Sequence, residues 1–238
     1  MQRFKIFCKR IKMTLGIIGA LPAEIAPLLA HYKDYETIEF GGNTFYKVKL
    51  ANKTAIIAKS RIGKVHSALT ASSMILHFGC EKIVFNGIAG ALNPTYRVGD
   101  LLFASKLCQH DVNLSVFGYP HGFIPESETF ASSDSTLNAV AKQVAKELGI
   151  CIYEGIVASG DQFINHKDKK QWIRETFKAD AVEMEGASVA VVCENLNVPF
   201  CVIRTISDSV NDEHLEEYNE EESGKRNVAF IIKMVEKI

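Results

Sequence analysis

The sequence lacks the patterns that mark several large classes of protein. Its six cysteines include no Cys-x-x-Cys pair, and its seven histidines include none at the spacing of metal ligands. We therefore expect neither a disulfide framework nor a metal site. No stretch approaches the ~20 consecutive apolar residues that span a membrane. No linker, repeat or low-complexity segment divides the 238 residues, which favours a single domain.

The charge is balanced, and this limits the partners that we expect. The net charge is −1, without the basic excess that is typical of a nucleic-acid-binding protein. The motifs Gly-x-Gly-x-x-Gly and Gly-Lys-Ser/Thr are both missing, so nothing indicates a nucleotide cofactor. Most cysteines lie in or beside apolar runs, which is typical of reduced thiols in a cytoplasmic protein. The composition favours a cytoplasmic protein that acts on a small molecule and needs no cofactor, nucleic acid or membrane.

The first residues form a segment of their own. Residues 1–12 carry five basic residues and no acidic one, and an apolar run follows at 15–20. This order resembles a secretory signal, but the run is shorter than the usual ~7–15 residues and contains two glycines. We predict that residues 1–12 are a disordered extension, that Met13 is an alternative start, and that residues 13–238 form the single domain.

Apolar runs alternate with segments of helical period along the rest of the chain. Strands that alternate with helices, and that are apolar on both sides, indicate an α/β fold. We predict a three-layer α/β/α sandwich around a mixed, largely parallel twisted sheet. The expected strands are 14–19, 44–50, 54–59, 82–86, 100–107, 155–159, 181–183 and 200–206, and the expected helices are 22–32, 63–78, 134–148, 168–177, 186–195 and 223–237.

Three short motifs place acidic residues where buried strands are expected to end. They are Gly-Ala-Leu-Pro-Ala-Glu ending at Glu24, Ala-Val-Glu-Met-Glu-Gly at 181–186 and Arg-Thr-Ile-Ser-Asp at 204–208. Ligands of open α/β sheets bind beyond the carboxyl ends of the strands, so these acids should share one rim of the sheet. Separate carboxylates can divide acid and base duties. Such a site suits cleavage of a bond that needs both a protonated leaving group and an activated water.

Two of these motifs differ in how well a structural role explains them. An acid at the position of Glu24 is common in the first turn of a helix, where the helix dipole favours it. Glu183 and Glu185 lie in an apolar strand-to-helix transition, where acids are disfavoured unless they are paired or functional. The second motif therefore favours a functional role more strongly than the first does.

The third motif continues the most hydrophobic strand of the chain. Arg204 and Asp208 can form a structural ion pair, or they can act as an anchor and a general acid. Ser207 can orient the aspartate through a hydrogen bond in either case.

Three further segments supply candidate binding residues. Residues 86–90, Asn-Gly-Ile-Ala-Gly, are expected to form a glycine-rich turn. Its backbone at Ala89 and Gly90 would contact a sugar or base, or the glycines would serve only to form the turn. Phe163 follows a turn and suits stacking on a planar base, although a lone Phe is more often part of a core. The aromatic-rich residues 117–125 fit an exposed interface or a lid over an apolar substituent.

Taken in order, these motifs resemble the 5′-methylthioadenosine/S-adenosylhomocysteine nucleosidases of the nucleoside phosphorylase superfamily. The similarity extends from about Leu15 to the C-terminal helix, and Gly-Ala-x-x-x-Glu, Ser-Gly-Asp-x-Phe-Ile, Val-Glu-Met-Glu and Ile-Ser-Asp carry it. Ile-Gly-Lys-Val-His-Ser at 62–67 and Gln-His-Asp-Val at 109–112 strengthen it. The sequence is most similar to the subgroup of Helicobacter and Campylobacter, which also acts on 6-amino-6-deoxyfutalosine in menaquinone synthesis.

The resemblance implies a nucleoside phosphorylase-like fold and hydrolysis of the N-glycosidic bond of 5′-substituted adenine nucleosides. The substrates would be 5′-methylthioadenosine, S-adenosylhomocysteine, 5′-deoxyadenosine and aminodeoxyfutalosine, in methionine salvage and menaquinone synthesis. By this resemblance Asp208, held by Ser207, protonates N7 of adenine. Glu24 activates the water with help from Arg204, and Glu185 holds the ribose hydroxyls. The other substrate contacts would come from Ala89, Gly90, Phe163, Ile164, Glu183 and Met184.

The family is homodimeric, and this implies a partner for the loop at 114–125. Leu114, Phe117 and Pro125 match positions that a partner subunit lends to the pocket for the 5′-substituent. Residues 209–222, which include an acidic run, differ from the family's usual pattern where a lid is expected.

Two other functions are compatible with the same fold. A purine nucleoside phosphorylase needs a cationic phosphate site, but phosphorylase relatives carry an Arg where this chain has Phe85, and Glu24 would repel phosphate. A non-enzymatic binding or storage protein would not need three acids, and the presence of Glu24, Glu185 and Asp208 argues against it.

Overall fold

The computed structural model describes residues 13–208 and 220–238, with the side chains of 220–226 left out. The predicted extension at 1–12 and most of the predicted lid at 209–222 lie outside the described residues. The strands are β1 (Met13–Gly19), β2 (Tyr35–Phe40), β3 (Asn43–Lys49), β4 (Lys53–Lys59), β5 (Lys82–Ala91), β6 (Leu101–Gln109), β7 (Phe130–Ser132), β8 (Ile152–Ser159), β9 (Ala181–Glu183) and β10 (Phe200–Asp208). The helices are α1 (Pro22–Tyr32), α2 (Lys64–Leu76), α3 (Ser135–Leu148), α4 (Lys167–Phe177), α5 (Gly186–Asn195) and α6 (Glu220–Lys237), with a short 3-10 helix η1 (Ser115–Phe117).

Every predicted helix and strand is present, with ends that shift by a few residues. Local chemistry explains the helix ends best. Pro22 occupies the first turn of α1, where its missing N–H costs nothing. Asp134 caps α3 by accepting a hydrogen bond from the amide of Leu137, and Gly149 ends that helix in the left-handed conformation.

All described strands belong to one mixed sheet. Its centre is parallel, in the order β4-β1-β5-β10, and β2 and β3 extend it as an antiparallel edge. Strand β10 pairs with β6 as well as with β5, and the path continues through β8 and β9 back to β5. This half of the sheet therefore closes into a ring, which the sequence did not predict.

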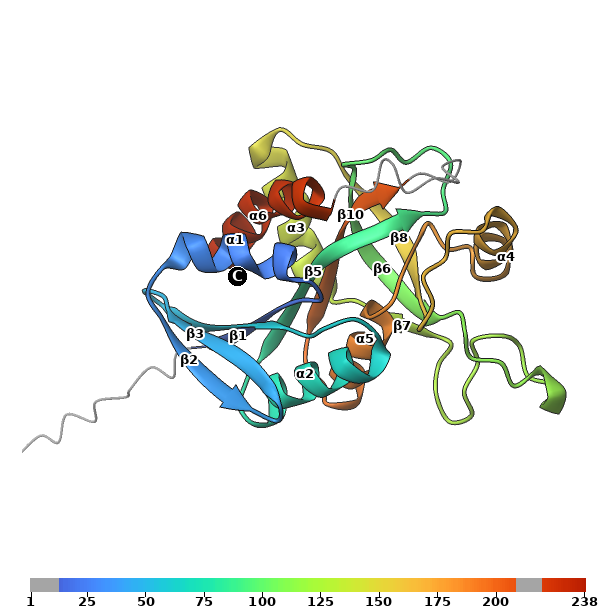
Figure 1. Cartoon of the computed structure of the whole chain (residues 1–238), viewed down its shortest axis with the longest axis horizontal. Helices are drawn as coiled ribbons and strands as arrows, with labels where there is room; N and C mark the ends of the chain where they lie inside the picture. Colours follow the sequence, from blue (N-terminus) through green and yellow to red (C-terminus); the bar gives the residue numbers. More distant parts are fainter. Residues whose placement is uncertain (1–12, 209–219) are drawn as a thin grey trace, which may run out of the picture.

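Helices cover both faces of the sheet, as the predicted three-layer sandwich requires (Figure 1). Side chains alternate along each strand, so neighbouring residues of β10 enter different cores. Cys201 and Ile203 pack on the side of α1, α3 and α6, whereas Val202 and Ile206 pack on the side of α2 and α5. Most core residues of both clusters are completely buried.

Helix α4 stands apart from these two layers and has a small core of its own (Figure 1). Ile173 and Phe177 pack there against residues of β8 and β9, and Trp172 covers the edge of this cluster. Within the described residues, none of the helices is both long and apolar enough to cross a membrane.

Candidate functional site

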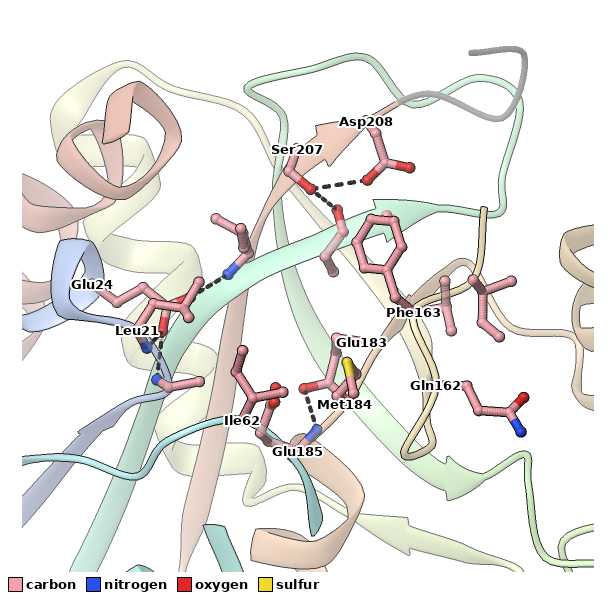
Figure 2. Close-up of a pocket in the computed structure, with 16 residues that line it drawn as sticks. Leu21, Glu24, Ile62, Gln162, Phe163, Glu183, Met184, Glu185, Ser207 and Asp208 are labelled. Carbon is pink, nitrogen blue, oxygen red and sulfur yellow. Dashed lines mark hydrogen bonds between the residues drawn. The ribbon is translucent and has the colours of Figure 1, made fainter. Parts of the chain in front are cut away.

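A cavity opens where β1, β5, β9 and β10 end (Figure 2). Its empty volume, part of which is open to solvent, is about 630 Å³. Glu24 lies on one side of the cavity, Asp208 lies across it, and Glu185 lies at its base. The three acids that were predicted to share a rim therefore line a single cavity.

Glu24 enters the cavity from the first turn of α1. Its carboxylate is buried and accepts hydrogen bonds from the backbone amides of Ala20, Leu21 (2.9 Å) and Ile88 (3.1 Å). Burial raises the pKa of Glu24, and the charge of Arg204 and the three amides oppose this shift in part. The result is a desolvated carboxylate with increased affinity for a proton.

An irregularity in β10 places Asp208. Ile206 lies opposite Ala89 of β5 and Asp208 lies opposite the next residue, so Ser207 is an extra residue in β10. Such a bulge turns side chains away from their regular alternation. The hydroxyl of Ser207 lies 3.0 Å from Oδ1 of Asp208 and 3.3 Å from the carbonyl oxygen of Ala89, and it donates to one or the other (Figure 2).

The prediction of a glycine-rich turn at residues 86–90 was wrong, because these residues continue β5. The glycines of this segment allow other side chains to pack closely against the strand, and they do not turn the chain. A Cβ atom at Gly87 would lie 3.0 Å from Nη1 of Arg204, and one at Gly90 would lie 3.0 Å from both carboxylate oxygens of Asp208. Glycine within a strand marks such close approaches.

Glu183 and Arg204 form a buried ion pair beneath the cavity. Nη2 of Arg204 lies 2.6 Å from Oε2 of Glu183, and the side chains are 1% and 3% exposed. Glu183 also accepts hydrogen bonds from the hydroxyl of Ser159 and from two backbone amides. The guanidinium carbon of Arg204 lies 4.1 Å from the centre of the Phe85 ring. Arg204 thus supports the site from below and does not line the cavity.

Glu185 is the acid at the base of the cavity. Its Oε1 accepts a hydrogen bond of 2.9 Å from the amide of Gly63, the residue before α2. Burial, and next the negative charge of Glu183, raise the pKa of Glu185 to about 8. A carboxyl group that titrates near neutrality can both donate to and accept from hydroxyl groups.

The loop between β8 and α4 carries Phe163 to the cavity. The amide of Asp161 donates to Asp111, whose carboxylate also lies 2.7 Å from Nζ of Lys64. Asp161 in turn accepts a hydrogen bond of 2.8 Å from the amide of Lys64. This closed set of bonds fixes the loop, while Phe163 remains 55% exposed at the cavity.

The structure brings most predicted site residues together, but not all. Arg204 lies beneath the cavity, and its ion-pair partner is Glu183. Leu114, Phe117 and Pro125 lie on the protruding segment around η1, away from this cavity. Those that line the cavity are Glu24, Ala89, Gly90, Phe163, Ile164, Glu183, Met184, Glu185, Ser207 and Asp208.

Several residues of the site were missed by the sequence analysis, and three of them have clear roles or positions. Ile62 lines the cavity, the amide of Ile88 binds Glu24, and Nζ of Lys170 lies 2.8 Å from Oδ2 of Asp208. Lys170 left a trace in the sequence, because it shares its helical face with Ile173 and Phe177, which are both buried. A lysine on an apolar face indicates a buried charge that needs a partner.

Comparisons with known proteins identify the family to which the chain belongs. Residues 14–238 match the model of the phosphorylase superfamily. The chain is 48% identical to an aminodeoxyfutalosine nucleosidase of Helicobacter pylori, over 94% of this chain and 99% of that one. It is 47% identical to the enzyme of that name from Campylobacter jejuni, over 95% and 100%. The crystal structure of a 5′-methylthioadenosine/S-adenosylhomocysteine nucleosidase from Campylobacter jejuni superposes with a TM-score of 0.92 at 46% identity, over 95% and 100%.

Proposed function

Because the chain belongs to the phosphorylase superfamily and is similar to nucleosidases of that superfamily, we propose that it hydrolyses N-glycosidic bonds. Its substrates are 5′-substituted adenine nucleosides: 5′-methylthioadenosine, S-adenosylhomocysteine, 5′-deoxyadenosine and aminodeoxyfutalosine. The products are adenine and the free sugar. The observation that carries the proposal is the position of Glu24 and Asp208 on opposite sides of one cavity (Figure 2).

The chemistry of the bond requires this arrangement. As the bond between the sugar and the purine breaks, positive charge develops on the sugar and negative charge on the purine. Asp208 donates a proton to N7 of adenine, and the electron pair of the broken bond stays on the purine. Glu24 takes a proton from the water that attacks the sugar, a step that its increased proton affinity favours.

The remaining residues hold the substrate. Phe163 stacks on the adenine ring, and the backbone of Ile164 binds its edge. Met184 contacts the ribose, and Glu185 binds its hydroxyl groups. Arg204 acts through its charge, which favours the ionised form of Glu24.

Phosphorolysis is the alternative within the superfamily. A phosphate nucleophile needs cationic donors at the sugar. Here Glu24, Glu183 and Glu185 surround that position, and Arg204 is already paired with Glu183. Phe85 packs on the guanidinium, and none of the described residues that line the cavity is a lysine or an arginine. These features support water as the nucleophile.

We further propose that two copies of the chain form a dimer. Val65 and Leu69 on α2 and Val116 and Phe117 on η1 are large apolar residues that are each at least half exposed. Their exposure supports an interface in which Leu114, Phe117 and Pro125 complete the partner's pocket for the 5′-substituent. The free thiols of the described cysteines, four of them buried, support a reducing compartment such as the cytoplasm.

The proposal is tested by assaying the purified protein in phosphate-free buffer. We expect adenine and the free sugar from 5′-methylthioadenosine and from aminodeoxyfutalosine, at rates that added phosphate does not change. Release that depends on phosphate and yields a sugar 1-phosphate would identify a phosphorylase. Tight binding of the nucleoside without release of adenine would identify a binding protein.

A further inference from the structure

Helix α4 contains a buried lysine that faces the cavity region. Lys170 is 2% exposed and shares the inner face of the helix with Ile173 and Phe177. These two apolar residues pack in the small core beside β8, which fixes the position of the helix. An ammonium group that is removed from water needs an anionic partner. Asp208 is such a partner, with its Oδ2 atom 2.8 Å from Nζ of Lys170.

The carboxylate of Asp208 is therefore held at both oxygens. Lys170 binds Oδ2, and the hydroxyl of Ser207 lies 3.0 Å from Oδ1. Gly90 leaves the space in which the carboxylate sits, because a Cβ there would lie 3.0 Å from both oxygens. The pair joins α4 to β10 across 38 residues of sequence, so the orientation of Asp208 depends on the helix as well as on its own strand.

The two partners of Asp208 differ in what they can do when the acid is neutral. Ser207 can turn its hydroxyl proton to the carbonyl of Ala89, 3.3 Å away, and so leave Oδ1 available for a proton. The ammonium of Lys170 can only donate, and it can bind Oδ2 whether that atom belongs to a carboxylate or to the carbonyl of a neutral carboxyl group. Oδ1 is thus the oxygen that is able to exchange a proton.

We propose, on the basis of the proposed nucleosidase function, that Lys170 is a positioning residue that holds Oδ2 of Asp208 while Oδ1 delivers the proton to the purine. In this step the O–H bond of Asp208 breaks, the N–H bond at N7 forms, and Lys170 keeps its three protons. The ammonium then stabilises the carboxylate that remains, through a charge-assisted hydrogen bond.

The test compares two substrates that differ only in the leaving group. 5′-Methylthioadenosine needs a proton on its purine, whereas 4-nitrophenyl 5-methylthioribofuranoside releases 4-nitrophenolate, which leaves without one. For Lys170→Met we expect the kcat for 5′-methylthioadenosine to fall by about 10- to 100-fold, because a misplaced acid loses this much, with little change in KM. The kcat for the nitrophenyl substrate should stay near that of the unmodified protein.

Lys167→Met is the matched control, since Lys167 lies on the same helix but is exposed. It should change neither rate. Lys170→Arg keeps the charge. Its ratio of the two rates should therefore lie between that of Lys170→Met and that of the unmodified protein. Both rates are measured on one preparation, so a smaller folded fraction lowers them equally and leaves their ratio unchanged.

Two results would overturn the positioning role. The first is that Lys170→Met leaves the ratio of the rate for 5′-methylthioadenosine to the rate for the nitrophenyl substrate unchanged, either because both rates fall equally or because neither falls. The second is that this ratio is as low in Lys170→Arg as in Lys170→Met. Asp208→Asn separates this from the proposed function. If Asp208→Asn lowers only the rate for 5′-methylthioadenosine while Lys170→Met does not, the role of Lys170 fails alone. If Asp208→Asn lowers both rates equally, the acid role of Asp208 fails as well.

Discussion

Glu183 and Asp208 are both paired with a buried cation, but they differ in how many other groups hold them. Glu183 binds Arg204, a serine hydroxyl and two backbone amides, and its side chain is 3% exposed. Among the residues that the structure describes, Asp208 binds Lys170 and Ser207, and its side chain is 17% exposed at the cavity. The first acid has its hydrogen-bonding capacity filled by the protein, whereas the second keeps room for a ligand.

The comparison separates a supporting role from a chemical role among acids that line one cavity. A buried ion pair with every lone pair occupied holds its surroundings in one arrangement. An acid that is held by two side chains, one of them a hydroxyl with a second acceptor nearby, can gain and lose a proton without a change of the backbone. We therefore assign Glu183 to support and Asp208 to the reaction.

The largest effect should come from substitution of Asp208, the acid that we assign to the reaction. For Asp208→Asn we expect the rate of adenine release to fall by about 10²- to 10⁴-fold, the usual contribution of a general acid. Substrate should still bind, because the amide keeps the shape of the side chain. Steady-state kinetics and calorimetric titration measure the two quantities. Turnover at the original rate would remove Asp208 from the acid role.

On the structural side, Glu183→Gln should act mainly on stability. It removes the charged partner that is hydrogen-bonded to the buried Arg204 guanidinium, and breaking a buried ion pair typically costs about 3–5 kcal/mol. Urea unfolding followed by circular dichroism measures this loss. If Glu183→Gln lowered the free energy of unfolding by less than Asp208→Asn does, the assignment of the two acids would be reversed.

Glu185 tests the comparison through pH, since burial and the neighbouring Glu183 raise its pKa to about 8. Between its ordinary value of 4.5 and about 8, the folded state keeps a proton that the unfolded state has already lost. The free energy of unfolding should therefore fall as pH rises through this range. Glu185→Gln, which has no such proton, should flatten this part of the stability curve. A curve with unchanged slope would show that burial leaves Glu185 ionised.

The smallest effect should come from an ion pair on the surface. Lys142 and Glu154 lie 2.9 Å apart, but their side chains are 57% and 52% exposed. Water screens such a pair, and we expect Glu154→Gln to change the free energy of unfolding by less than about 1 kcal/mol. The same urea experiment measures it. A loss as large as that of Glu183→Gln would mean that burial is not what distinguishes the ion pairs of this protein.

Much of the fold follows from local chemistry and could be predicted. The bounds of α1 and α5 agree with the sequence prediction at both ends, because helical period and end residues coincide there. Strand β2 was missed for a physical reason. It is an edge strand with nearly all of its side chains exposed, so it has no apolar pattern to find.

The site was predictable where its chemistry lies in continuous motifs. Glu24, Glu185 and Asp208 were found in this way and line one cavity. The bulge at Ser207 and the continuation of β5 through Gly87 were not, because both depend on side chains that meet only in the folded chain. The ion pair between Lys170 and Asp208 was also not predicted, because it joins segments that are distant in the sequence.

Trp172, the single tryptophan of the chain, lies on α4 two residues after Lys170. The Nζ atom of Lys169 lies 3.8 Å from the centre of its ring, and the His121 ring lies edge-on at 5.0 Å. Indole fluorescence responds to nearby charge and to water, and the indole emission of the unlabelled protein comes from this one residue. A spectral shift on addition of a nucleoside analogue would then follow this helix directly, in real time and without a dye.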